Sequence, residues 1–229
     1  MLDVKAVLFD LHGTLAHCPN RMTDTEISDY LLKRGYEVSS QTLRAAWSFV
    51  ALVDYPRHGY KDWKSFFSRV FHRLDAEVNE RTLESLVELL EATPYQLLPD
   101  AARAVRRAKE AGFKTAVVTT IARFQFSKAI EPIEECLDFV MTGYEAGCDK
   151  SNPKMYLKVL EVLGVEPGEA VMIGDELLLD IVLPKKLGIR TVLLDRERRT
   201  RPDCGSVDAF VYDLDNAMET VISWHRKKD

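Results

Sequence analysis

Cysteine is scarce in this chain of 229 residues, and the few cysteines are widely spaced. The four are Cys18, Cys136, Cys148 and Cys204, with no Cys-x-x-Cys pair among them. Structural zinc sites need closely spaced thiols, and disulfide frameworks belong mainly to small secreted domains. We therefore expect neither zinc nor disulfides, but free thiols in a reducing compartment.

Long apolar runs and an excess of positive charge are also missing. No run approaches the roughly 18–20 apolar residues that span a bilayer, and the first apolar stretch meets Asp10 too early for a signal peptide. The 31 Lys and Arg residues are outnumbered by 36 Asp and Glu residues, for a net charge of −5. General binding to nucleic acid or anionic membranes requires the opposite balance. We expect a cytoplasmic protein, monomeric or homodimeric, that binds neither.

What the chain does contain is an alternation of apolar strand-like segments with helical ones. The strand-like segments cover residues 4–10, 114–119, 139–141, 170–174, 190–194 and 209–212. Helical patterns with Gly or Pro at their ends separate most of them. This β-α-β-α order predicts an α/β fold with a doubly wound parallel sheet.

Residues 21–91 interrupt that order with helical patterns alone. Four helices are expected, over residues 23–34, 39–50, 60–74 and 80–90, with apolar side chains at helical spacing. Four helices without a strand are typical of an inserted helical domain. We therefore expect a core of residues 1–16 and 94–229 and an inserted domain of residues 17–93.

Three of the predicted strands end at a polar side chain, namely Asp10, Thr119 and Asp175. In doubly wound sheets the carboxyl ends of parallel strands form the edge where ligands bind. Asp10 can act as a nucleophile toward phosphorus, and Asp175 adds a second carboxylate suited to Mg²⁺. Thr119 supplies a hydroxyl donor and Lys150 a cation for phosphoryl oxygens. The pattern indicates phosphoryl transfer.

Four segments, in order, resemble the four motifs of the haloacid dehalogenase superfamily. They are Asp10-Leu11-His12-Gly13-Thr14 for Asp-x-Asp-Gly-Thr, Val117-Val118-Thr119 for a strand ending in Thr or Ser, Lys150 with Asn152-Pro153 for Lys-Pro-x-Pro, and Gly174-Asp175 with Asp180 for Gly-Asp-x-x-x-x-Asp. Ser151 and Asn152 depart from the third motif. The resemblance covers essentially the whole chain, and the inserted helices resemble the family's cap, which closes over the site.

The resemblance implies a role for each matching residue. Asp10 attacks the phosphoryl group and forms an aspartyl-phosphate, while Asp10, Asp175 and the backbone carbonyl of His12 hold Mg²⁺. Thr119 and Lys150 bind phosphoryl oxygens. The implied substrate is a small phosphorylated metabolite.

Asp180 supports the metal or positions Lys150 in the same comparison. His12 departs from the family pattern, in which phosphatases carry an aspartate that protonates the leaving group and then activates water. Three interpretations stay open. His12 does the acid/base work itself; or it does so poorly, leaving a weakened enzyme that binds a phospholigand or a partner; or the reaction differs.

The family's metal-independent 2-haloacid dehalogenases carry Tyr at this position and its phosphonatases carry Ala. Asp175 preserves the metal site that dehalogenases lack, so the sequence favours Mg²⁺-dependent hydrolysis of phosphate esters. Phosphonate cleavage would need a lysine in the cap, and no lysine there is singled out by its context.

Four further residues are candidates for substrate contact. Arg21 lies where the chain leaves the core, Thr120 follows Thr119, and Arg57 and His58 fall in an expected loop between cap helices. Each also has a structural alternative, as a solvated hinge or loop residue. The charged run at residues 196–201 is expected to be a solvated loop.

Overall fold

The computed structural model describes residues 3–198 and 207–226. Its centre is a six-stranded sheet of order β5-β4-β1-β6-β7-β8, in which every neighbouring pair is parallel. The strands are β1 (Ala6–Phe9), β4 (Lys114–Val118), β5 (Phe139–Met141), β6 (Ala170–Gly174), β7 (Arg190–Leu194) and β8 (Ala209–Val211). The expected doubly wound parallel sheet is confirmed, with β1 between the two halves of the winding.

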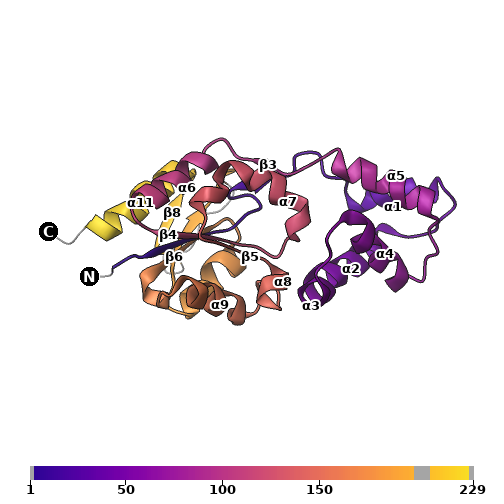
Figure 1. The fold of residues 1–229 in the computed structure, drawn as a ribbon. Coiled ribbons are helices and arrows are strands. Elements are labelled where there is room, and N and C mark those ends of the chain that lie inside the picture. The colour runs from indigo at the N-terminus through magenta and orange to yellow at the C-terminus, as the bar shows by residue number, and fades with distance from the viewer. Residues whose placement is uncertain (1–2, 199–206, 227–229) are drawn as a thin grey trace.

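Helices cover both faces of this sheet because its strands alternate apolar side chains between two buried layers. Val7 and Phe9 pack toward α6 (Ala101–Glu110) and α11 (Leu214–Arg226), while Ala6 and Leu8 pack toward α9 (Pro153–Leu163). Figure 1 shows these helices above and below the strands. The shorter segments of the core are α7 (Arg123–Ile130), η2 (Glu131–Cys136), α8 (Gly143–Ala146), η3 (Pro167–Glu169), η4 (Leu177–Val182) and α10 (Leu183–Lys186).

The inserted helices lie to one side of the sheet and form a separate apolar cluster (Figure 1). They are α1 (Asp24–Leu32), α2 (Ser40–Phe49), α3 (Tyr55–His58), α4 (Trp63–Arg73) and α5 (Glu80–Glu91). A π-helical segment, η1 (Val50–Asp54), continues α2 into the short α3, which the sequence did not predict. The third expected helix begins at Trp63 rather than Tyr60 because the Asp62 side chain caps it, accepting from the Ser65 amide at 2.6 Å.

A two-stranded antiparallel ribbon joins the core to the helices, with β2 (Ala16–His17) paired to β3 (Gln96–Leu97). The chain leaves and re-enters the core through this ribbon. At the opposite end α3 packs on α8, where the Tyr55 hydroxyl lies 3.0 Å from Thr142 Oγ1 and accepts from the Arg123 amide at 3.2 Å. The exact division at residues 17 and 93 stays a prediction.

Two smaller expectations concern thiols and membranes. Cys18, Cys136 and Cys148 are free thiols, and Cys204 lies outside the described residues. Among the helices that the structure describes, none is both long enough and apolar enough to span a bilayer.

Candidate active site

The three strand-end side chains meet at one edge of the sheet. Asp10 follows β1, Thr119 follows β4 and Asp175 follows β6, and β1 is the neighbour of both other strands. Together with Lys150 they line a cavity of about 420 Å³. The parallel sheet therefore places side chains close together that are up to 165 positions apart in the sequence, from residue 10 to residue 175.

Three carboxylates form a cluster at this cavity: Asp10 and Asp175 line it, and Asp180 is fully buried. Asp10, Asp175 and Asp180 each offer an oxygen within 4.8 Å of the others. Burial raises the pKa of Asp175 to about 6, with repulsion from Asp180 adding to it. Burial likewise raises the pKa of Asp180 to about 6, although Lys150 opposes the shift. Carboxylates held this close stabilise one another's protonated forms unless a cation joins them.

Lys150 is the cation inside the cluster. Its Nζ is hydrogen bonded to Asp10 and lies 2.5 Å from Asp180 Oδ1, and the side chain is almost wholly buried. Burial lowers its pKa, but the two carboxylates outweigh burial and the net shift is upward, so the ammonium stays charged. One ammonium against three carboxylates leaves an excess of negative charge, and the all-oxygen donor set fits a divalent cation such as Mg²⁺.

Two glycines allow the carboxylates to come this close. Gly13 adopts a φ of +82°, and a Cβ there would collide with the Asp175 carboxylate. A Cβ on Gly174 would collide with the carboxylate of Asp180. The glycines in the loop after Asp10 and directly before Asp175 therefore allow close packing at the site as well as a special backbone geometry.

His12 lies at the rim of the same cavity, in contact with a residue that the sequence did not single out. Its Nδ1 is 3.2 Å from the hydroxyl of Tyr95, a buried residue just before β3, and the two rings meet edge to face. Burial on this side lowers the pKa of His12, and the charges of Arg21 and His17 lower it further. Burial raises the pKa of Tyr95 to about 12, so its hydroxyl keeps a proton to donate.

Thr119 and Thr120 present hydroxyls to the cavity from the end of β4. Thr119 is buried, and its Oγ1 accepts from the Ile121 amide at 3.2 Å. That contact uses the oxygen as an acceptor and leaves the hydroxyl proton for a ligand.

The four candidate substrate residues divide into two pairs. Arg21 and Thr120 line the cavity with Asp10. Arg57 and His58 are exposed at the end of α3 and are not among the residues that line it. A substrate role for any of the four stays a prediction.

Arg196 corrects the expectation of a solvated loop. It forms a two-pronged ion pair with Asp100, at 3.0 and 2.9 Å, and donates to the carbonyls of Gly13 at 3.2 Å and Thr14 at 2.9 Å. Arg196 thus holds the loop that follows Asp10 in place. Residues 199–201 of the same run lie outside the described residues.

Comparison with known proteins gives a consistent result. The family model of haloacid dehalogenase-like hydrolases matches residues 4–188. A glyceraldehyde 3-phosphate phosphatase of Pyrococcus furiosus is 26% identical over 84% of this chain and 81% of its own length. The crystal structure of a phosphatase of the same family from Thermococcus onnurineus has a TM-score of 0.64 at 25% identity, covering 95% of this chain and 98% of that one. A 2-haloacid dehalogenase from Pseudomonas syringae, at 19% identity and 96% and 99% coverage, shares the fold with a TM-score of 0.72.

Proposed function

This chain belongs to the haloacid dehalogenase-like hydrolases, and from that premise we propose that it hydrolyses small phosphate monoesters through an aspartyl-phosphate on Asp10, with Mg²⁺ as cofactor. The observation that carries the proposal is the carboxylate cluster of Asp10, Asp175 and Asp180 around the buried Lys150. The family's metal-independent dehalogenases do not need a carboxylate at the position of Asp175. The phosphatase names among the relatives support the same reaction class.

The first step forms a bond between an Asp10 oxygen and phosphorus and breaks the bond from phosphorus to the ester oxygen. Lys150 stays charged and supplies a fixed positive group beside both Asp10 and the incoming phosphoryl oxygens. The Thr119 hydroxyl donates a further hydrogen bond. These groups need no reorganisation during the reaction, because burial and ion pairing already hold them in place.

The residues that would hold Mg²⁺ are Asp10, Asp175 and the backbone carbonyl of His12. When bound, the ion offsets the repulsion between the anionic nucleophile and the anionic phosphoryl group. Gly13 keeps the loop after Asp10 close to Asp175, as this ligand set requires.

His12 stands where the family's acid/base aspartate stands. With Nδ1 facing the Tyr95 hydroxyl, its Nε2 is the nitrogen left to exchange a proton with the leaving oxygen and then with water. In the second step water attacks phosphorus, gives its proton to His12 and releases phosphate, which restores Asp10.

A second candidate follows from the lowered pKa of His12. A neutral imidazole is a poor proton donor, so the chain would bind phosphorylated ligands and turn them over slowly. This candidate predicts thermal stabilisation by such ligands with negligible release of phosphate.

One assay separates these possibilities. Phosphate release from p-nitrophenyl phosphate is measured with Mg²⁺ or with EDTA, for the wild type and Asp10→Asn. The proposal expects Mg²⁺-dependent release that Asp10→Asn abolishes, and it fails if the wild type releases no more than that variant. Halide release from a 2-haloacid in EDTA would instead establish the dehalogenase.

The role of His12 is tested with His12→Asp in the same assay, using an alkyl phosphate beside the aryl one. Alkyl leaving groups need protonation more than p-nitrophenolate does. If His12 is a weak acid, His12→Asp raises the alkyl rate more than the aryl rate. An unchanged or lower rate on both substrates assigns the acid/base role to His12.

A further inference from the structure

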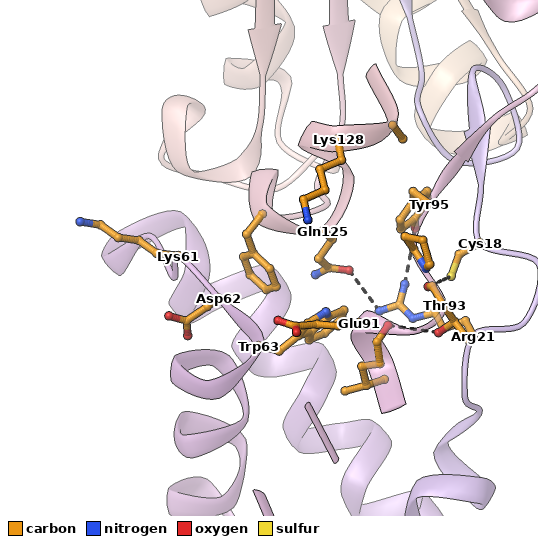
Figure 2. Close-up of a pocket in the computed structure, with 14 residues that line it drawn as sticks. Cys18, Arg21, Lys61, Asp62, Trp63, Glu91, Thr93, Tyr95, Gln125 and Lys128 are labelled. Atoms are coloured by element: carbon orange, nitrogen blue, oxygen red, sulfur yellow. Dashed lines mark hydrogen bonds between the residues drawn. The ribbon is translucent and has the colours of Figure 1, made fainter. Parts of the chain in front are cut away.

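Arg21 lies between two cavities, in the linker from β2 to α1. Its side chain lines the catalytic cavity together with Asp10 and Lys150. It also lines an adjoining cavity of about 260 Å³, whose walls come from the cap and from α7. Figure 2 shows the guanidinium of Arg21 at the centre of this second cavity, between Tyr95 and Gln125.

Among the residues that the structure describes, the hydrogen-bond partners of the Arg21 side chain are neutral. Nη1 lies 3.5 Å from the Tyr95 hydroxyl and Nη2 lies 3.4 Å from Gln125 Oε1, so both contacts are long. Within residues 3–198 and 207–226 no carboxylate forms an ion pair with it, although Asp62 and Glu91 also line the adjoining cavity. A half-buried guanidinium that lacks an anion has given up water without full compensation.

Two tryptophans hold the guanidinium in place. Its central carbon lies 5.0 Å from the ring centre of Trp47 and 5.7 Å from that of Trp63. Such contacts engage the faces of the aromatic rings and leave the N–H groups of the arginine available. The arginine is therefore already oriented to donate to an anion in the cavity.

Arg21 also lies on the side of the cavity where the leaving group departs. The Tyr95 hydroxyl that it contacts is the same hydroxyl that contacts Nδ1 of His12. In the mechanism proposed above, His12 protonates the leaving oxygen, while Lys150 and Thr119 take the oxygens of the transferred phosphoryl group. Arg21 is thus not required for the transferred group and is free to bind the rest of the substrate.

We propose that Arg21 binds a second anionic group on the alcohol part of the substrate, either a carboxylate or another phosphate. This inference rests on the phosphatase activity proposed above and narrows its substrates to small phosphate monoesters with two anionic ends. Lys128, exposed on the wall of the adjoining cavity, adds positive charge on the same side. The shared chemistry is a planar or tetrahedral oxyanion that matches the arginine fork.

The experiment compares substrates that differ only in the second anion. For the carboxylate, kcat/KM is measured on 2-phosphoglycolate and on 2-hydroxyethyl phosphate. For the phosphate, the pair is 1,3-propanediol bisphosphate and 3-hydroxypropyl phosphate. The wild type should prefer the substrate with two anionic groups over its neutral-ended partner in one of the two pairs. That pair shows whether Arg21 binds a carboxylate or a phosphate.

Arg21→Gln should remove this preference. A lost charge-assisted hydrogen bond corresponds to a decrease of roughly 10- to 100-fold in the ratio of kcat/KM between the doubly anionic substrate and its neutral-ended partner. The loss of positive charge near His12 acts on both substrates and cancels in this ratio. Arg21→Lys keeps the charge but loses the forked guanidinium, so its ratio should lie between those of the wild type and Arg21→Gln. Because both substrates are measured on one protein sample, a partly misfolded variant does not alter the ratio.

Arg81→Gln is the matched control, since Arg81 is an exposed arginine of α5 that lines neither cavity. It should leave the ratio unchanged. If it lowers the ratio as much as Arg21→Gln, general attraction by the cap's charge explains the preference and the proposal is overturned. Equal loss on both members of each pair in Arg21→Gln, or no preference in the wild type, overturns it as well.

A binding measurement distinguishes failure of this inference from failure of the proposed function. In the Asp10→Asn background no turnover is expected, and thermal stabilisation by 2-phosphoglycolate is compared with that by 2-hydroxyethyl phosphate, and likewise for the bisphosphate pair. A larger shift for the doubly anionic ligand of either pair, lost in Asp10→Asn/Arg21→Gln, supports the role of Arg21 even if the wild type hydrolyses nothing. Equal shifts with and without Arg21 contradict it even if the enzyme is active.

Discussion

Replacing Arg196 with alanine is expected to damage both the stability of the core and the active site. The side chain joins its own segment after β7 to two others: Asp100 just before α6, and the carbonyls of Gly13 and Thr14 in the loop after Asp10. Asp100 also accepts from the Leu214 amide at 2.9 Å, which ties α11 to the same point. Arg196→Ala leaves the Asp100 carboxylate buried with its cationic partner gone.

The magnitude follows from burial. Side-chain exposure is 24% for Arg196 and 11% for Asp100, so the pair is poorly screened by water. Breaking a fully buried pair costs about 3–5 kcal/mol, and this partly exposed one should cost about 2–4 kcal/mol. In a chain of this size each kcal/mol lowers the Tm by about 2–4 °C.

The chain supplies its own control in Arg103, which makes a similar two-pronged pair with Asp215 at the surface. There the exposures are 59% and 35%, so Arg103→Ala should cost no more than about 1 kcal/mol. Urea unfolding of both variants gives the two free energies, and phosphate release gives kcat. Equal destabilisation by the two variants would refute the argument from burial, and an unchanged kcat in Arg196→Ala would refute the link to the loop after Asp10.

Three other predictions follow from the site and its surroundings. Burial raises the pKa of Asp175 and of Asp180 to about 6, above the values of unfolded carboxyls, so the metal-free protein should lose stability as the pH rises through about 4–6. Mg²⁺ should therefore raise the Tm more at neutral pH than at acid pH. Differential scanning fluorimetry measures this difference, and Asp175→Asn should remove it. Gly13→Ala should push the Asp175 carboxylate away, because a Cβ at residue 13 has no room and the backbone φ there is positive. In titrations of activity, the Mg²⁺ concentration needed for half-maximal activation should rise at least tenfold. An unchanged concentration would contradict the packing argument. Tyr55→Phe removes the hydroxyl that contacts Thr142 between α3 and α8. The variant should raise KM a few-fold with little loss of Tm. An unchanged KM would show that this contact does not hold the cap in its position over the site.

The core of the fold could be predicted because its signals are local. Apolar segments of three to seven residues, separated by helical patterns that end at glycine or proline, predict a doubly wound sheet by general rules of connection. The ribbon of β2 and β3 could not be predicted, since each strand has only two residues and its partner lies about 80 positions away. The short α3 was missed for a related reason: η1 continues α2 by π-type bonds that leave no mark in the apolar spacing.

The candidate site shows the same division. Asp10, Thr119 and Asp175 could be placed together because each ends a strand, and Lys150 was found by its motif. Tyr95 had no such signal, because it lies in the returning linker and reaches His12 only through the fold.

Arg196 was missed for a different reason. It lies in a run of charges whose composition resembles a solvated loop, and its partner Asp100 reads as an ordinary residue before a helix. Only a signal that both positions change together among relatives could have paired them from sequence.

In the proposed mechanism, Arg21 and Tyr95 connect the cap with the side of the site where the leaving group departs. Arg21 lies in the outgoing linker and packs on Trp47 and Trp63 of the helices α2 and α4. Tyr95 lies in the returning linker and contacts His12 of the core. Arg21 contacts the hydroxyl of Tyr95, so the two linkers meet at this hydrogen bond. A substrate that bridges from the phosphoryl site to Arg21 would therefore stabilise the arrangement in which the two linkers are in contact, because it would bind that arrangement more tightly.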